Sequence, residues 1–126
     1  MSLRYLSLEE ILRLHFQLIE DFGGLHGVRD ENRLKSVVNA PRQEAFDQEQ
    51  YPALYEKAAV YLRNIIGDHP FSDGNKRTAV TVCGIFLARN GKNLVVHPKD
   101  LEDFTIKVTT EHLSIAEIAA WLSARV

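Results

Sequence analysis

One stretch of the chain, residues 75–90, would be apolar on nearly every side if it formed a helix, and it constrains the fold more than any other feature. A helix that is apolar all round has to be covered by other elements. The pattern therefore predicts a central buried core helix over residues 75–90. Its apolar residues are Ala79, Val80, Val82, Cys83, Ile85, Phe86, Leu87 and Ala88.

Five other segments show apolar residues at three- to four-residue spacing, which predicts amphipathic helices around the central one. Together they give an all-α fold of about six helices. We expect the first helix between Ser7 and Gly23, where Ser7 and Glu10 can form a capping box. The second is expected between Asp30 and Pro41. The remaining helices are expected over about residues 53–66, 99–109 and 115–124, and Ser114 with Glu117 can form a second capping box at the start of the last one.

Three segments lack helical spacing. Residues 41–52 are polar and carry Phe46 and Tyr51 as isolated aromatics, which indicates a surface loop or a short β-hairpin. This segment could act as a flap over a functional site, or it could be an idle loop. The glycine-rich segment 23–27 matches neither nucleotide-binding fingerprint, so a plain turn is expected there. Residues 94–96 can form one short strand at most.

Composition excludes several classes of function. With 126 residues, the chain is expected to form one domain over residues 1–126. The formal net charge of -2 argues against direct nucleic-acid binding, which usually requires a basic face. No apolar run is long enough to span a membrane, and no signal peptide is visible. The single cysteine, Cys83, cannot form an internal disulfide and is expected to pack in the core, which suits a cytoplasmic protein.

The densest group of polar residues lies just before the central helix, in the stretch from His69 to Thr78. Lys76 and Arg77 fall where that helix should begin. Cations at a helix start cost roughly 0.3–1 kcal/mol each, because that end already carries partial positive charge. Such local violations tend to occur at functional sites. The unpaired N–H groups of a helix start, together with two cations, form a strong anion site, and phosphate fits it best.

The individual residues of this stretch also suit phosphoryl chemistry, although each has a structural alternative. A histidine such as His69 can take a proton from a hydroxyl near neutral pH, or it can be structural. Because it precedes Pro70, its backbone is expected to be extended. Asp73 can hold Mg²⁺ together with substrate phosphates, or it can cap a turn. Gly74 permits close approach of the backbone to a ligand.

The other motif residues can also be interpreted as structural or as chemical. Phe71 is expected to anchor the loop on the core, and Asn75 either caps the helix or donates to a phosphate. Lys76 and Arg77 supply charge, or they form a solvated pair. In combination these residues are what a protein needs to move a phosphate-containing group from a nucleotide to a hydroxyl.

The run His69-Pro70-Phe71-x-Asp73-Gly74-Asn75-Lys76-Arg77 resembles the signature HxFx(D/E)GNxR of the Fic/Doc family, and in particular its death-on-curing (Doc) toxins. Two further runs are similar to Doc proteins. The resemblance thus extends over nearly the whole chain and implies the compact Fic-type helical fold. These runs are Gly23-Gly24-Leu25-x-Gly27 and Phe86-Leu87-x-x-Asn90-Gly91.

The resemblance implies a role for each motif residue. His69 would be the general base and Asp73 the Mg²⁺ ligand. ATP would be bound by Phe71, Gly74, Asn75, Lys76 and Arg77.

Position 76 separates two reactions that the resemblance allows. Fic adenylyltransferases have glycine there and transfer AMP to protein hydroxyls, whereas this chain has Lys76. A lysine fills space and adds charge. In the Doc branch this lysine accompanies transfer of the γ-phosphate to a threonine of elongation factor Tu, which halts translation. The resemblance therefore favours a kinase-type toxin, with an adenylyltransferase as the alternative. A catalytically silent binding module is the third reading.

Toxins of this branch are neutralised by an antitoxin whose disordered C-terminal segment folds into a groove on the toxin. A groove of this kind needs exposed apolar side chains. Leu14 and Phe16 lie off the main apolar stripe of the first expected helix. We therefore expect these two residues to line the groove for the antitoxin.

Overall fold

The computed structural model describes residues 2–126, so Met1, which belongs to the expected domain, lies outside the described residues. The described chain forms six α-helices, one short 3-10 helix and one two-stranded hairpin, which confirms the expected fold class. The elements are α1 (Leu8–Phe22), α2 (Glu31–Asn39), η1 (Ala40–Arg42), β1 (Glu44–Ala45), β2 (Gln48–Glu49), α3 (Leu54–Asp68), α4 (Asn75–Arg89), α5 (Pro98–Thr110) and α6 (Ile115–Ser123).

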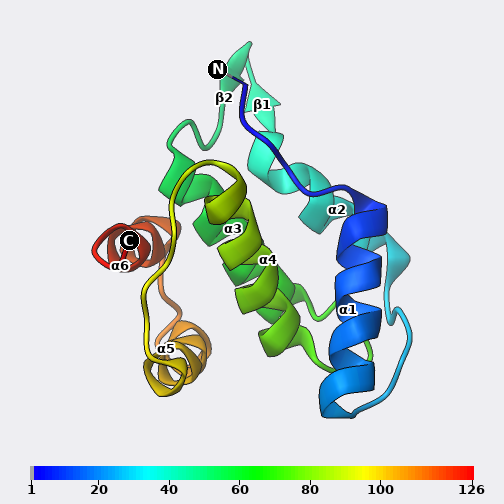
Figure 1. Ribbon diagram of the computed structural model, residues 1–126. Helices are drawn as coiled ribbons and strands as arrows, with labels where there is room; N and C mark the ends of the chain where they lie inside the picture. The colour runs from blue at the N-terminus through cyan, green and yellow to red at the C-terminus, as the bar shows by residue number, and fades with distance from the viewer. Residues whose placement is uncertain (1) are drawn as a thin grey trace.

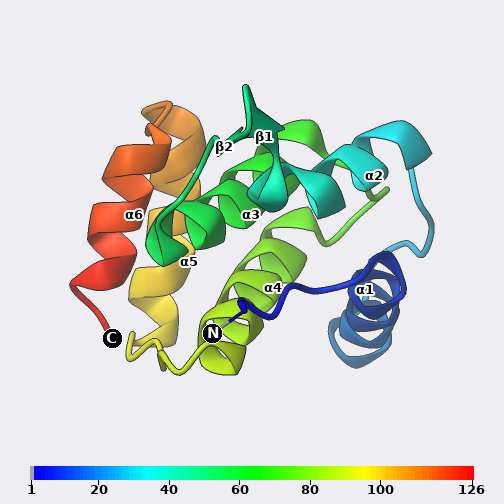
Figure 2. The ribbon, with the colours of Figure 1, turned by 90° about the horizontal axis from the view of Figure 1, so that it is seen from above.

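Helices α3 and α4 run through the middle of the molecule, with α1 and α2 on one side and α5 and α6 on the other (Figure 1, Figure 2). α3 packs against α2, η1, α4, α5 and α6, whereas α4 packs against α1, α3 and α5. Six consecutive residues of α3, from Lys57 to Leu62, are buried. The central position predicted for residues 75–90 is therefore shared by α3 and α4. α4 is not buried on every side, since it keeps an exposed edge that includes Lys76, Arg77 and Arg89.

The helix ends follow the local signals with one exception, the end of α3. Both capping boxes form, Ser7 with Glu10 on α1 and Ser114 with Glu117 on α6. α3 continues through Gly67 to Asp68, because the left-handed residue that ends it is His69. Residues 94–96 form no strand in the described chain, and the Val95 N–H instead donates to the Arg125 carbonyl at 2.7 Å.

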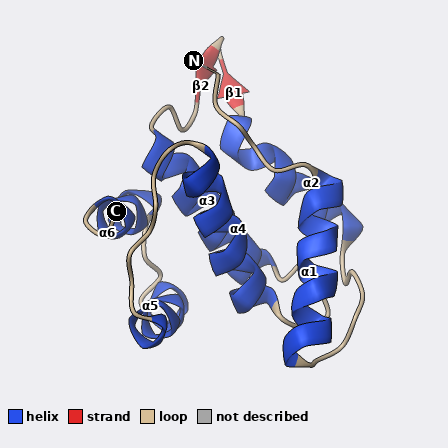
Figure 3. Cartoon of the chain, viewed as in Figure 1, coloured by secondary structure: helices blue, strands red, loops and turns tan. Residues whose placement is uncertain are grey.

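The polar segment 41–52 contains the short hairpin that was one of its two expected forms (Figure 3). Glu44 of β1 lies opposite Glu49 of β2 in antiparallel register. The two turn residues, Phe46 and Asp47, have φ of 53° and 62°. Positive φ at both central positions matches the twist of a two-residue hairpin.

A buried lysine fastens this hairpin to the first turns of α3. The Lys57 side chain is 0% exposed, and its Nζ donates to the Pro41 carbonyl at 2.9 Å and to Glu49 Oε1 at 3.1 Å. A buried ammonium group requires such partners. Lys57 lies near the start of α3, whereas His69 follows its last residue. A cleft lies beside His69, and of the described residues none between 41 and 52 lines it, so the structure does not place a flap over that cleft.

The structure also bears on Cys83 and on the search for a membrane-spanning helix. Cys83 is 1% exposed, and burial raises the pKa of its thiol to about 12, so it is a packing residue as predicted. No helix of the described chain has the length and apolar character needed to cross a membrane.

Candidate active site

The motif lies in the loop that joins the end of α3 to the start of α4. His69 has φ 47° and ψ 59°, and Gly74 has φ 72°. The expectation of an extended His69 is therefore wrong, because the chain has to reverse direction directly after α3. A left-handed conformation costs a non-glycine residue roughly 1–2 kcal/mol. The contacts around His69 have to compensate for this cost.

Arg29, in the segment after α1, and Arg33 of α2 hold the end of α3. Arg29 Nε donates to the His69 carbonyl at 2.7 Å, and its Nη2 donates to the Asp68 carbonyl at 2.8 Å. Arg33 Nη1 donates to the same Asp68 carbonyl at 3.1 Å. These bonds satisfy carbonyl groups that a helix end leaves unpaired.

The Asn75 side chain fastens the motif loop to the first turn of α4. Its Oδ1 accepts from the Phe71 N–H at 3.0 Å, and its Nδ2 donates to the Phe71 carbonyl at 3.0 Å. Nδ2 also lies 3.4 Å from Nδ1 of His69. Asn75 is only 8% exposed. The Asn75 amide therefore holds the shape of the loop. Because its oxygen and nitrogen already have partners there, we expect it to have little hydrogen-bonding capacity left for a nucleotide.

Phe71 is the anchor that the sequence suggested, and its ring is buried in the core. The side chain is 0% exposed, and it is not among the residues that line the cleft. Its ring stacks on His15 of α1, with centroids 3.8 Å apart and planes at 5°. The ring therefore packs behind the motif loop, and the cofactor-binding role that the resemblance implies for Phe71 stays a prediction.

His15 holds the loop through a hydrogen bond as well. Its Nε2 lies 2.8 Å from the Asp73 carbonyl oxygen. Since a carbonyl only accepts, the Nε2 carries the proton and donates. Burial lowers the pKa of His15, and its charged form is disfavoured accordingly. His15 is only 4% exposed. Its contact with the motif had no signal in the sequence.

The Asp73 carboxylate is oriented by backbone N–H groups. Its Oδ1 accepts from Gly74 at 2.9 Å, and its Oδ2 accepts from Leu25 at 3.1 Å. A Cβ atom at Gly24 would lie 2.7 Å from Asp73 Oδ2. The glycine is required there, because the loop backbone passes directly over the carboxylate.

The glycine-rich segment 23–27 is therefore not a plain turn. The Ser72 N–H donates to the Gly27 carbonyl at 3.0 Å, and Val28 forms a β-bridge with Phe71. The segment pairs with the motif loop and positions its carboxylate. The glycines gave a signal that could have been followed, since their cluster marks a close approach of two backbones.

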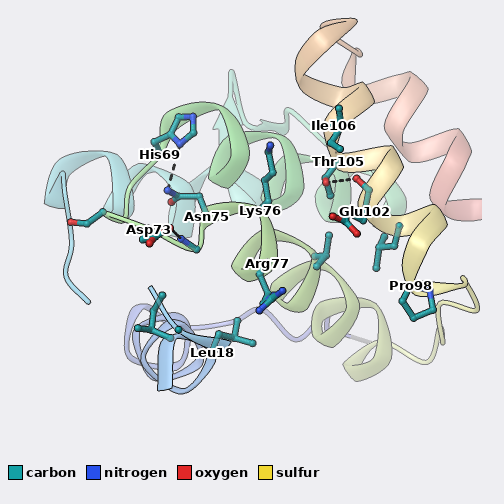
Figure 4. Close-up of a pocket in the computed structure, with 16 residues that line it drawn as sticks. Leu18, His69, Asp73, Asn75, Lys76, Arg77, Pro98, Glu102, Thr105 and Ile106 are labelled. Carbon is teal, nitrogen blue, oxygen red and sulfur yellow. Dashed lines mark hydrogen bonds between the residues drawn. The ribbon is translucent and has the colours of Figure 1, made fainter. Parts of the chain in front are cut away.

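An open cleft of about 740 Å³ lies beside the motif loop (Figure 4). Six of the seven expected site residues line it, and Phe71 is the exception. Residues of α5 line the cleft opposite the motif, and apolar residues of α1 and α4 also line it. The motif residues are His69, Asp73, Gly74, Asn75, Lys76 and Arg77, the α5 residues are Pro98, Leu101, Glu102, Thr105 and Ile106, and the apolar residues of α1 and α4 are Leu18, Ile19 and Val80.

The two cations at the start of α4 are exposed and available to an anion. Within the described chain, neither Lys76 nor Arg77 forms an ion pair with an acidic side chain. The Arg77 guanidinium lies 3.9 Å from the ring centroid of Phe22, which gives it a cation–π contact. Together with the positive end of α4, these side chains fit the anion site that the sequence suggested, and anion binding there stays a prediction.

Comparison with known proteins shows the family of the chain. A family model described as "Fic/DOC family" matches residues 5–87. The chain belongs to the Fic/Doc family. This Fic/Doc chain is 34% identical over 117 residues to "Protein kinase doc" of Escherichia phage P1, a match that covers 93% of this chain and 91% of that protein. It is 36% identical over 104 residues to "Toxin Doc" of Mycolicibacterium smegmatis, which covers 81% and 80% of the two chains.

A solved structure supports the fold of this Fic/Doc protein. Fic-1 from C. elegans superposes with a TM-score of 0.69 at 18% identity. The match covers 95% of this chain and 41% of the C. elegans chain. At this identity the likeness shows the fold alone, and it confirms the expected Fic-type helical fold.

Proposed function

We propose that this Fic/Doc protein is a toxin that transfers the γ-phosphate of ATP to a threonine of elongation factor Tu and thereby halts translation. The observation that carries the proposal is the gathering of His69, Asp73, Lys76 and Arg77 around one cleft at the start of α4. The phage P1 relative, which is named a protein kinase and is 34% identical, supports the choice of reaction.

His69 is the proposed general base. It is exposed at the edge of the cleft, where a hydroxyl of a protein substrate can approach. The base takes the hydroxyl proton as the oxygen attacks the γ-phosphorus, and the bond from that phosphorus to the bridging oxygen of ADP breaks. ADP then leaves with the electron pair of that bond.

The start of α4 is the proposed binding site for the phosphates of ATP. The first N–H groups of a helix have no partner within the helix, and they point toward an anion placed there. Lys76 and Arg77 add charge, and the guanidinium of Arg77 can bind two phosphate oxygens at once. Gly74, which has no side chain, leaves the backbone accessible.

Asp73 is the proposed Mg²⁺ ligand, and its surroundings fit this role in one specific way. The described residues contain no cluster of three acidic, His or Cys side chains that could hold a metal alone. Mg²⁺ is commonly held by one or two carboxylates together with phosphate oxygens and water. Each Asp73 oxygen accepts one backbone N–H and keeps a second lone pair. When bound, the ion would neutralise charge on the phosphates.

Lys76 supports γ-phosphate transfer over adenylylation. Its side chain occupies the cleft wall beside His69 and Asn75, at the position where adenylyltransferases of the family have glycine. The ammonium group adds charge where a phosphate would otherwise have space. Transfer of AMP remains the rival outcome. A catalytically silent binding module is the other rival. Such a module would need neither the exposed base His69 nor the carboxylate of Asp73.

An antitoxin is the proposed partner, because the M. smegmatis relative carries the name of a toxin. Leu14 and Phe16, which were expected to line one groove together, differ in exposure. Leu14 packs against the core, whereas Phe16 is 55% exposed and lies against His26. Phe16 is therefore the more accessible contact for an antitoxin segment. A target on a translation factor would place the action of the protein in the cytoplasm.

The proposal is tested by mapping the modification on purified elongation factor Tu. The factor is incubated with ATP, Mg²⁺ and either the wild-type protein or His69→Ala, and its peptides are analysed by mass spectrometry. We expect a phosphothreonine with the wild type and none with His69→Ala. An adenylylated residue, or an unmodified factor, would contradict the proposal.

A further inference from the structure

The backbone of His69 adopts a conformation that the chain would not choose locally. Its φ of 47° is left-handed, and a proline follows it. Strained conformations persist only where the surrounding structure fixes them, and they concentrate at functional sites. The contacts that fix His69 can therefore be identified from the hydrogen bonds of residues 68–70.

We propose that Arg29 is a positioning residue for His69, an inference that rests on the proposed role of His69 as base. Arg29 contacts three successive carbonyl groups of the turn. Its Nη2 donates to Asp68 at 2.8 Å, its Nε donates to His69 at 2.7 Å, and its backbone N–H donates to Pro70 at 2.8 Å. The side chain and the backbone of Arg29 thus bind the carbonyl groups of His69 and of its two neighbours, where the chain reverses direction.

Arg33 shows which of these bonds is specific to Arg29. Arg33 Nη1 also donates to the Asp68 carbonyl, at 3.1 Å, so that group keeps a partner when Arg29 is removed. The Pro70 carbonyl keeps the N–H groups of residues 29 and 30, at 2.8 and 3.2 Å, whatever the side chain at 29. Of the described residues, only the Arg29 side chain donates to the His69 carbonyl.

The His69 ring has little other support. Its one hydrogen-bond contact within the described chain is with Asn75 Nδ2, at 3.4 Å. Donor–acceptor distances of ordinary N–H hydrogen bonds fall between about 2.7 and 3.2 Å, so this contact is weak. The residue is exposed and lines the cleft, so the core does not enclose the ring. Its position is therefore set from its own backbone, which Arg29 holds.

A comparison of Arg29→Ala with Arg33→Ala tests the proposal. Both variants remove one guanidinium from the end of α3, but only the first frees the His69 carbonyl. We expect kcat for transfer to fall about tenfold or more in Arg29→Ala with an unchanged KM for ATP, since a displacement of about 1 Å can cost up to 10²-fold. Arg33→Ala is expected to keep kcat within about twofold. Added methylguanidinium should restore part of the rate of Arg29→Ala, and Arg29→Lys should give an intermediate kcat.

A second measurement is independent of activity. The ¹³Cα and ¹³Cβ chemical shifts of His69 report its backbone conformation in the full chain. We expect them to move toward extended values in Arg29→Ala and to stay at wild-type values in Arg33→Ala. Thermal melting of each variant shows that the fold is kept.

The outcomes separate the possible failures. An unchanged kcat in Arg29→Ala, or equal losses in both variants, would overturn the positioning role, because a general helix cap would explain either result. If the wild type transfers nothing, the proposed function fails, and the chemical shifts alone decide. Unchanged His69 shifts in Arg29→Ala would then overturn the inference.

Discussion

The Nε2–H of His15 in α1 donates to the carbonyl of Asp73 in the motif loop at 2.8 Å, although the two residues are 58 positions apart. The same imidazole stacks on Phe71. The buried His15 side chain thus holds the loop in two ways, by stacking on Phe71 and by its hydrogen bond to Asp73. α1 is therefore part of the framework of the site as well as a wall of the fold.

Substitution of His15 should destabilise the protein. In His15→Ala the stack on Phe71 and the bond to Asp73 are both lost, and we expect the free energy of unfolding to fall by about 2–4 kcal/mol. His15→Phe keeps an aromatic ring and should lose less. Urea unfolding of the variants checks this, with His26→Ala as a surface control that should change stability by less than about 0.5 kcal/mol. Equal losses in His15→Ala and His26→Ala would contradict the prediction.

Gly24 and Gly23 offer a matched pair for the position of the carboxylate. A Cβ at Gly24 would lie 2.7 Å from Asp73 Oδ2, whereas a Cβ at Gly23 would have no neighbour within 4 Å. Both residues have positive φ, so alanine costs conformational energy at either position, about 1–2 kcal/mol.

We therefore expect Gly24→Ala alone to weaken Mg²⁺-dependent ATP binding, because only it displaces the carboxylate. Isothermal titration of ATP with and without Mg²⁺ measures this effect. If both alanine variants bind ATP equally well in the presence of Mg²⁺, the loop does not position Asp73.

Glu10 gives a pH dependence of stability. Its hydrogen bond with Arg89 and the backbone bond within the capping box lower the pKa of Glu10 from 4.5 to about 2. The folded state therefore holds the charged form more tightly than the unfolded state. The resulting stability is complete above pH 4.5 and is lost as the pH falls toward 2.

The side chain is partly exposed, so we expect a contribution of only about 1 kcal/mol. Glu10→Gln keeps the capping box and removes the ion pair. Urea unfolding at pH 6 and at pH 3 should show a smaller loss of stability in Glu10→Gln than in the wild type, on the order of 1 kcal/mol. Parallel losses in the two proteins would exclude Glu10 as the titrating group.

Lys57 should matter for the hairpin more than for the cleft. Lys57→Ala removes a fully buried side chain and leaves the Pro41 carbonyl without its donor. We expect a loss of about 2–3 kcal/mol and faster amide exchange in residues 43–50. Exposed Lys35 provides the control, since Lys35→Ala should have little effect. Unchanged exchange in the hairpin of Lys57→Ala would show that the lysine does not hold it.

The helices and the site motif could be predicted from the sequence because their signals are local. The capping boxes of Ser7 and Ser114, the three- to four-residue apolar spacing and the cations at residues 76 and 77 all lie within a few positions of what they specify. The motif residues were close in sequence, and six of the seven expected site residues also share one cleft.

The support of the site could not be predicted, because it comes from segments far away in the sequence. Neither His15 nor Arg29 carries a local pattern that names its partner 40 or more positions later. The left-handed His69 was missed for the same reason. The rule for residues before proline describes an isolated dipeptide, and the bonds from Arg29 outweigh it here.

The nature of the transferred group is the central claim, and ATP labelled at either the α or the γ phosphorus tests it most directly. The wild-type protein, Mg²⁺ and a lysate containing elongation factor Tu are incubated with each label, with His69→Ala as control. The account predicts protein labelling from γ only, and none with His69→Ala. Labelling from α would contradict it and would show that Lys76 does not set the reaction.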